Sequence, residues 1–375
     1  MNLQIFFQIF SKTGTKGELW ASNKNGIFAA MKHLVTGIML FSFLGLFSCK
    51  AQNVNNLTVE AFAEALSPET CILDVRTAAE FEAGHLRGAE NIDWFHACFV
   101  DSIKARCGQD QPLYLYCRSG KRSAAAAEKL AKAGYTVYNL LGGYLAWTEA
   151  GREVTRYEVE RFRTPRGAVV EITLVKHASL EIRFKGLSIQ VDPVAELGKK
   201  TDYAKEFPKA DYILVTHEHF DHFDQAAIDA LRKDGTVLIT NNRCAQMTGW
   251  GKALANGDSL QLAFDMEAVP AYNITEGHLQ FHPKGRDNGY VLTLDGLRIY
   301  IAGDTEDIPE MAALKDIDLA FLPCNQPYTM TVEQCVHAAQ MIQPKVLIPY
   351  HFGNTDLSGL PAQLPGTDVR LRALQ

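Results

Sequence analysis

Apolar and polar positions divide the chain into two regions that follow an apolar N-terminal stretch. In the first region, residues 56–152, short apolar runs alternate with amphipathic segments. The runs are CILDVR, PLYLYC and TVYNLLGG, and the segments include TVEAFAEAL and KRSAAAAEKLAKAGY. Short apolar strands separated by helices are typical of a parallel sheet with helices on both faces. We therefore predict an α/β domain here.

The second region, residues 168–356, has longer apolar runs. They include VVEITLVKHASLEIRFKGLSIQVDP, YILVTHEH, GYVLTLDGLRIYIAGD and KVLIPYHF. Gly186 and the pair Asp295-Gly296 fall between such runs and predict hairpin turns. Helical segments such as DQAAIDALRKDG and TVEQCVHAAQMI lie between the later runs. We predict mixed sheets covered by helices.

Two segments outside these regions are expected to be connections. Residues 153–167 are rich in charge, and Pro165 and Gly167 interrupt any regular element there. We expect a linker at 153–167 and a C-terminal tail at 357–375.

Composition supports two globular domains and excludes one class of function. At 375 residues the chain is too long for one typical domain. Its hydrophobic fraction of 47% and charged fraction of 21% are ordinary for folded proteins. The net charge is -6 and no long Lys/Arg run is present, so we exclude nucleic-acid binding as a main role.

The stretch MKHLVTGIMLFSFLGLFSCK has the layout of an export signal over residues 31–49. Its apolar core, residues 34–47, is short for a membrane-spanning helix. The ending LFSC resembles the lipobox of bacterial lipoproteins, which implies lipidation of Cys49. We expect translation to start at Met31, with residues 1–30 as an upstream extension or misassigned start; the alternative is a genuine extension before a membrane-inserted segment. The mature protein is then exported, periplasmic or anchored through that lipid.

The eight cysteines contain no repeated C-x-x-C pairs, which argues against a zinc ribbon or a dense disulfide framework. In an exported protein, Cys98 and Cys107 are close enough in sequence for a bridge, and the alternative is two unpaired thiols. Cys71 is interpreted as a core or disulfide thiol. Cys324 lacks a loop before a helix and is interpreted as a core thiol.

The stretch YCRSGKRS places Cys117 between an apolar run and a helix. Loop amides and the helix N-terminus would face the sulfur and favour an anion. Nearby positive charge would stabilise the thiolate and make the cysteine nucleophilic near neutral pH. The spacing C-x4-R suits a single sulfur atom better than a phosphoryl group. The anion-binding loop comprises Arg118, Ser119, Gly120, Lys121 and Arg122.

Residues 57–151 closely resemble the rhodanese family, or thiosulfate sulfurtransferases. The resemblance rests on LDVRTAAEFEAGHLRGAENID, on YCRSGKRS and on LLGGYLAW. It implies that Cys117 accepts sulfur from a small sulfane-sulfur donor as a persulfide and passes it to a thiol acceptor. We interpret Asp74 and Arg76 as structural residues that bond the strand end to a neighbouring loop.

The second candidate site begins in THEHFDHF, after the run YILV. Histidines two apart in an extended segment project to the same side, so His217 and His219 can bind one metal ion. Asp221 and His222 then reach a neighbouring position. Imidazole and carboxylate are the usual ligands of zinc and iron, and the stretch predicts a metal site.

This pattern resembles the H-x-H-x-D-H motif of the metallo-β-lactamase fold, with IYIAGDTE and VLIPYHF following in order. The resemblance implies an αββα sandwich with two divalent ions, zinc or alternatively Mn or Fe, in the cleft between its sheets. Such ions activate water and polarise a substrate oxygen or sulfur, and Asp221 would orient the attacking water. The implied assignment is His217 and His219 on the first ion, Asp221, His222 and His351 on the second, and Asp304 bridging.

The third protein ligand of the first ion is open between Asn273, His278 and His282. We favour His282, because FHPKG has the turn residues to place it and a catalytic metal needs three protein ligands. His177 matches a histidine near the active site in the branch with ascorbate-6-phosphate lactonase-like hydrolases, and a role beside the ligands or as a strand histidine stays open. The stretch LPCNQPYTM also resembles that branch.

Three functions follow from these motifs. We favour an exported enzyme that joins a sulfurtransferase domain to a metal-dependent hydrolase acting on a small molecule. The second is an iron-dependent persulfide dioxygenase supplied by Cys117. In the third, the rhodanese half is a docking or sensing module without catalysis.

Overall fold

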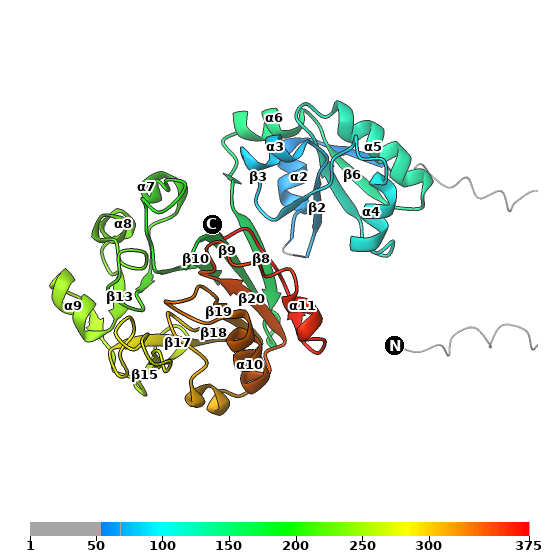
Figure 1. Ribbon diagram of the computed structural model, residues 1–375. Helices are drawn as coiled ribbons and strands as arrows, with labels where there is room; N and C mark the ends of the chain where they lie inside the picture. Colours follow the sequence, from blue (N-terminus) through cyan, green and yellow to red (C-terminus); the bar gives the residue numbers. More distant parts are fainter. Residues whose placement is uncertain (1–53, 68, 375) are drawn as a thin grey trace, which may run out of the picture. The chain divides into compact units, whose positions relative to one another are not determined.

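The computed structural model describes residues 54–374 except residue 68 (Figure 1), and these residues belong to one compact unit. The expected signal peptide and Cys49 lie outside the described residues. Within the part of the chain that is described, no helix is long and apolar enough to cross a membrane. The unit contains two domains, each with its own sheets and cores.

The first domain has a five-stranded parallel sheet in the order β1-β6-β5-β2-β4. Its strands are β1 (Val54–Leu57), β2 (Cys71–Asp74), β4 (Ala89–Asn91), β5 (Leu113–Tyr116) and β6 (Val137–Leu140). Its helices are α2 (Val59–Ala65), α3 (Ala78–Glu82), α4 (Phe99–Arg106), α5 (Lys121–Lys132) and α6 (Gly143–Glu149). Side chains of α4 and α5 share one apolar core, and those of α2 and α6 share another. The predicted α/β architecture is confirmed.

The second domain has two seven-stranded sheets, as an αββα sandwich requires. The first sheet contains β8 (Glu158–Arg163), β9 (Val169–Lys176), β10 (Ser179–Phe184), β11 (Leu187–Val191), β12 (Tyr212–Leu214), β13 (Val237–Thr240) and β14 (Lys252–Ala253). The second contains β15 (Ser259–Gln261), β16 (Asp265–Ala271), β17 (Asp287–Leu294), β18 (Leu297–Ile301), β19 (Leu319–Pro323), β20 (Val346–Tyr350) and β21 (Asp368–Val369). Inward side chains of both sheets form one apolar core.

Helices cover this sandwich. The helical elements are α7 (Tyr203–Glu206), α8 (Gln225–Leu231), α9 (Asn242–Thr248), η1 (Pro309–Ala313), α10 (Val332–Ile342) and α11 (Leu360–Gln363). Side chains of α7, α8 and α9 share a core with β12 and β13, while α10 and η1 pack into the core of the sheets. Figure 1 shows α8 and α9 beside β13, and α10 beside β18 and β19.

Both predicted hairpin turns are present. Lys185 and Gly186 join β10 to β11 with φ of 49° and 81°, and Asp295 and Gly296 join β17 to β18 with φ of 49° and 90°. Two-residue hairpins prefer turns in which both central residues have positive φ, because that twist matches the strands. The turns fix the register of the strands that lead toward the cleft.

The expectations for residues 153–167 and 357–375 are wrong. The first segment contains β8 and β7 (Val154–Thr155), which pairs with β3 (His85–Leu86); β8 pairs with β9 as an edge strand. The second contains α11 and β21, which pairs with β20. Charged side chains are common on edge strands, where they discourage pairing with other chains. The high charge of residues 153–167 therefore did not distinguish an edge strand from an irregular linker.

Candidate metal centre and cysteine loop

The ends of strands from both sheets supply the ligands of the candidate metal centre. The loop after β12 carries the HEHFDH stretch, His177 lies on the turn between β9 and β10, and Asp304 and His351 follow β18 and β20. His282 lies in the connection between β16 and β17. Two groups can each hold a metal ion, with ligand atoms within 4.8 Å of one another: His217, His219, His282 and Asp304; and His177, Asp221, His222 and His351.

Of the three alternatives for the third ligand, the first group contains His282 and neither Asn273 nor His278. The Nε2 atom of His282 lies 3.4 Å from Asp304 Oδ2, and His217 Nε2 lies 3.1 Å from His219 Nδ1. His278 instead faces Glu306 at 3.3 Å. The amide of Asn273 donates to the carbonyl of Tyr328, so this side chain ties two loops together and is outside the ligand group.

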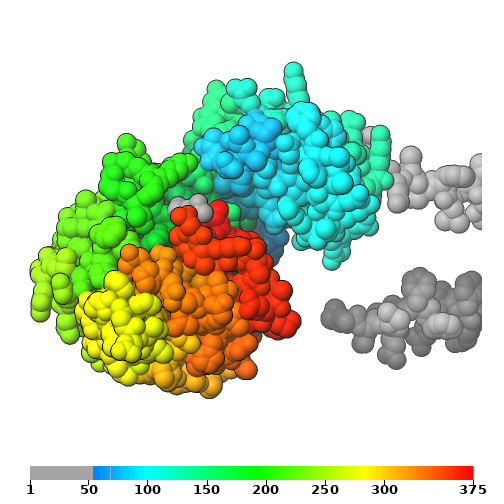
Figure 2. All heavy atoms as spheres, viewed as in Figure 1, coloured from blue at the N-terminus to red at the C-terminus, as the bar shows by residue number. Residues whose placement is uncertain are grey.

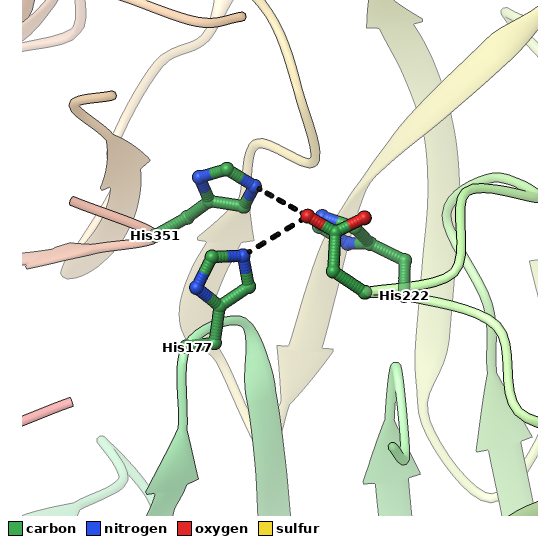
Figure 3. A group of neighbouring side chains, drawn as sticks. His177, His222 and His351 are labelled. Carbon is green, nitrogen blue, oxygen red and sulfur yellow. Dashed lines mark hydrogen bonds and ion pairs between the residues drawn. The ribbon is translucent and has the colours of Figure 1, made fainter. Parts of the chain in front are cut away.

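The second group contains the predicted Asp221, His222 and His351, and it also contains His177. Figure 3 shows the rings of His177 and His351 pointing toward one carboxylate, with contacts of 3.2 Å and 3.4 Å to Asp221 Oδ2. The rings of His177 and His351 lie 3.8 Å apart between centroids. His177 therefore lies among the candidate ligands of the second group, one of the two positions that the sequence left open for it.

Asp304 lies between the two groups. Its Oδ1 is 3.1 Å from His222 Nε2, and its Oδ2 is 3.2 Å from His351 Nε2 and 3.8 Å from His217 Nε2. A carboxylate in this position can bind both ions with its two oxygens. The bridging role that the resemblance implied fits this geometry.

Three residues that the sequence left without a role orient the histidines. Asp192 Oδ2 lies 2.8 Å from His222 Nδ1, and Asp287 Oδ2 lies 3.1 Å from His282 Nδ1. Thr216 Oγ1 lies 3.0 Å from His217 Nδ1. Such partners fix the tautomer, because the ring nitrogen facing the carboxylate carries the proton and leaves Nε2 for the metal. The sequence signal that could have found Asp192 is a carboxylate directly after an apolar strand.

Backbone conformation at the second group is unusual. His177, Asp192 and His351 have φ of 46°, 42° and 45°, in the left-handed region that side chains other than glycine rarely adopt. Each such residue costs about 1–3 kcal/mol and persists where the surrounding structure enforces it. Two members of the second group and the outer partner of His222 therefore have a backbone conformation that the surrounding structure must hold against local strain.

Negative and positive charge are balanced within the buried centre. Burial disfavours the charged form of His351, but Asp304 and Asp221 raise the pKa of this histidine to about 9. Burial likewise opposes charge on His222, whose pKa is raised well above its usual value by Asp304 and Asp192. Burial opposes ionisation of Asp304, yet the two histidines hold its pKa well below its usual value.

The residues fit a pair of divalent cations. Among the buried atoms without a hydrogen bond are His222 Nε2, His351 Nε2 and Asp304 Oδ1, all at the centre of the two groups. His222 Nε2 lies at ion-pair distance from Asp304 Oδ1, and His351 Nε2 from Asp304 Oδ2, but the geometry of these contacts is not that of hydrogen bonds. Since a buried polar atom without a partner is costly, coordination of metal ions explains why they converge.

The cysteine loop lies at the end of β5 in the first domain. Gly120 precedes α5 with φ 86° and no side chain caps this helix, so its first amides are free to face Cys117. Burial opposes ionisation of the thiol, but the Ser123 hydroxyl at 3.5 Å and the amides of Ser123, Ser119 and Gly120 outweigh it, and the pKa of Cys117 is lowered. The loop stabilises a thiolate as predicted.

The source of this stabilisation differs in part from the expectation. Arg122 makes two hydrogen bonds to Glu80, of 2.7 Å and 2.8 Å, and Arg118 and Lys121 are exposed. The hydrogen bonds from Arg122 hold the pKa of Glu80 at about 2. Arg122 is thus paired with Glu80, and the pKa of Cys117 is lowered by the Ser123 hydroxyl and by the backbone amides of the loop.

The other cysteines of the described residues are free thiols. Cys98 is exposed, whereas Cys107 is buried and shares a hydrogen bond with the thiol of Cys71. Of the two alternatives for Cys98 and Cys107, the structure has unpaired thiols. Cys324 is buried beside Cys335, as expected for a core thiol.

Asp74 and Arg76 have the structural role that the sequence indicated. The guanidinium of Arg76 bonds both oxygens of Asp74 and donates to the carbonyl of Gly84 at 2.6 Å. Both side chains are buried. The pair joins the end of β2 to the loop before β3.

Comparison with known proteins gives the same division. Residues 171–351 match the model of the beta-lactamase superfamily domain, and residues 58–150 match that of the rhodanese-like domain. A UPF0173 metal-dependent hydrolase of Ligilactobacillus salivarius is 34% identical over 191 residues, which cover 49% of this chain and 85% of the relative. One of Koribacter versatilis is 32% identical over 211 residues, covering 52% and 90%.

A solved structure extends this similarity. A protein of Parabacteroides distasonis assigned as a metal-dependent hydrolase is 53% identical, with a TM-score of 0.57 and coverage of 58% of this chain and 100% of that one. Sandwich and metal centre together define a metal-dependent hydrolase of the metallo-β-lactamase superfamily. The chain belongs to the UPF0173 metal-dependent hydrolases and carries a rhodanese-like domain ahead of the hydrolase domain.

Proposed function

We propose that the chain is a two-activity enzyme, with sulfur transfer at Cys117 and hydrolysis of a small molecule at a centre of two zinc ions. The observation that carries the hydrolytic part is the pair of four-residue groups that meet at Asp304. The depressed pKa of the Cys117 thiol supports the sulfur-transfer part.

The open side of the metal centre is formed by His177, His219 and Asp221, which are partly exposed, whereas the other five ligands are buried. Substrate and water therefore approach from this side. Two bound divalent ions supply Lewis acidity and lower the pKa of water. Asp221, whose side chain is 18% exposed, is the carboxylate placed to accept a hydrogen bond from the attacking water.

In the sulfur-transfer reaction, the Cys117 thiolate attacks the outer sulfur of a donor such as thiosulfate. A sulfur–sulfur bond forms at Cys117, the bond within the donor breaks, and sulfite leaves with the electron pair. A thiolate acceptor then attacks the outer sulfur of the persulfide, and the Cys117 thiolate is restored. Loop amides hold the negative charge at each stage.

Two measurements on the purified protein test both parts. Elemental analysis should find two equivalents of zinc per chain. Mass spectrometry after incubation with thiosulfate should find one added sulfur atom on Cys117, and Cys117→Ser should lose turnover from thiosulfate to cyanide while Cys98→Ser keeps it. Absence of turnover in the wild type would favour a rhodanese-like domain that serves only for docking or sensing.

The iron-dependent persulfide dioxygenase is the competing function for the second domain. Two complete ligand groups argue against it, because that reaction is expected to use a single iron. One iron per chain together with oxygen uptake on glutathione persulfide would overturn the hydrolase proposal in its two-metal form.

We also propose that residues 31–49 direct export and that Cys49 carries a lipid. The basic start, short apolar core and LFSC ending support this. Mass spectrometry of the mature N-terminus should find modified Cys49, and a mature chain that begins at residue 1 would contradict the proposal.

A further inference from the structure

The C-terminal segment, defined here as residues 367–374, reaches the metal centre. Its strand β21 pairs in parallel with β20, the strand that leads into His351. The segment then continues to Leu374, whose carbonyl accepts a hydrogen bond of 3.2 Å from the backbone amide of His177. Figure 2 shows this segment, in red, lying on the orange part of the second domain.

His177 is held through its backbone on both sides. Its amide donates to Leu374, and its carbonyl accepts a hydrogen bond of 3.1 Å from the amide of His351. Its φ of 46° is in the left-handed region, so this conformation needs external support. The imidazole leaves a tight turn between β9 and β10, and a change at this peptide would redirect the ring.

Two anchors fix the C-terminal segment. The side chain of Leu374 is 1% exposed and belongs to the core between the sheets. Arg370 and Arg372 both bind the carboxylate of Glu160, which lies on the edge strand β8 and is 8% exposed. By contrast, Leu371 is 38% exposed. The segment thus has a buried end at the metal centre and a charged attachment further away.

We propose that the C-terminal segment is a positioning element for the second metal ion: the Leu374 carbonyl holds His177 in the conformation that binds metal. This inference rests on the two-metal centre proposed above. The first group has no member bonded to the segment among the described residues. Loosening the segment should therefore affect the two metal sites unequally.

The test is the metal content of the full chain with matched substitutions. Leu374→Glu places a charge where the core is dry and should expel the segment, whereas Leu371→Glu makes the same change on the surface. After dialysis, elemental analysis should find one zinc equivalent in Leu374→Glu and in His177→Ala, and two in the wild type and in Leu371→Glu. Zinc titration should show the second binding step weakened roughly 10–100-fold, as for other groups that orient metal ligands.

A second pair of variants covers the case in which Leu374→Glu does not fold. Glu160→Gln weakens the charged attachment and should weaken only the second zinc step, while Leu374→Met should retain two equivalents. If folded Leu374→Glu and Glu160→Gln each bind two zinc equivalents with unchanged affinity, the inference is wrong and the two-metal proposal still stands. Fewer than two equivalents in the wild type would overturn the two-metal proposal and, with it, this inference.

Discussion

The cysteine loop and the metal centre are built in opposite ways. The groups that lower the pKa of the Cys117 thiol come from residues 119–123, at one strand end and one helix start. The eight residues of the two candidate ligand groups come from five separate connections, which follow strands of both sheets. Backbone amides in a local loop tolerate changes elsewhere, whereas a site assembled from distant strands depends on every register and every outer partner.

The largest expected effect concerns the residue on which both ligand groups depend. Asp304→Asn should lose both zinc equivalents and lower hydrolase activity by more than about 1,000-fold, because the bridging charge is removed. Asp307→Asn, three residues further along, is the matched control, since Asp307 faces only His337. Retention of both ions by Asp304→Asn would show that the two groups are independent.

Smaller and separable effects are expected from the outer carboxylates. Asp287→Asn should weaken binding at the first group and Asp192→Asn at the second, each by roughly 10–100-fold, because the facing histidine loses its orienting acceptor. Competition with a chromophoric chelator measures both steps. If either substitution weakens both zinc-binding steps equally, the assignment of Asp287 to the first group and Asp192 to the second is wrong.

A moderate effect is expected in the cysteine loop. Ser123→Ala removes one hydrogen bond to the thiolate, so the pKa of Cys117 should rise. Sulfur transfer should then fall several-fold at acidic pH and recover as the pH increases, with unchanged zinc content. Ser102→Ala on α4 is a control of the same chemistry. A pH profile that does not move would mean that the amides alone stabilise the thiolate.

The smallest effect concerns the pair of Glu80 and Arg122. Glu80 has a folded-state pKa of about 2, below its usual value of 4.5, so its stabilising contribution is present above pH 4.5 and is lost as the pH falls toward 2. Glu80→Gln should lower the free energy of unfolding by less than about 1 kcal/mol at pH 7, since the pair is partly exposed. Urea unfolding measures the difference, and exposed Glu82→Gln should show none.

The same difference between a local loop and a site assembled from distant strands explains which features could be predicted from the sequence. The sequence predicted both folds, and its motifs named the cysteine loop and seven members of the two candidate ligand groups, with His282 as the favoured one of three open alternatives. It left the role of His177 open and gave Asp192 and Asp287 no role. His177 and Asp192 meet their histidine partners only in the folded chain, because those partners are distant in the sequence. The segments that hold β8 and β21 were misjudged because pairing at a sheet edge leaves little periodicity in a short charged strand.

Sharing one carboxylate has a thermodynamic consequence for the metal centre. Whatever factor the first ion imposes on the affinity of the second must return, unchanged, in the opposite order of binding. Asp304 contacts histidines of both groups within 3.8 Å, so in the proposed two-metal centre we expect the two binding constants to be coupled. Half-filled centres are then set by a coupling free energy as well as by zinc concentration, and the order in which ions are removed should not alter the total work of emptying the site.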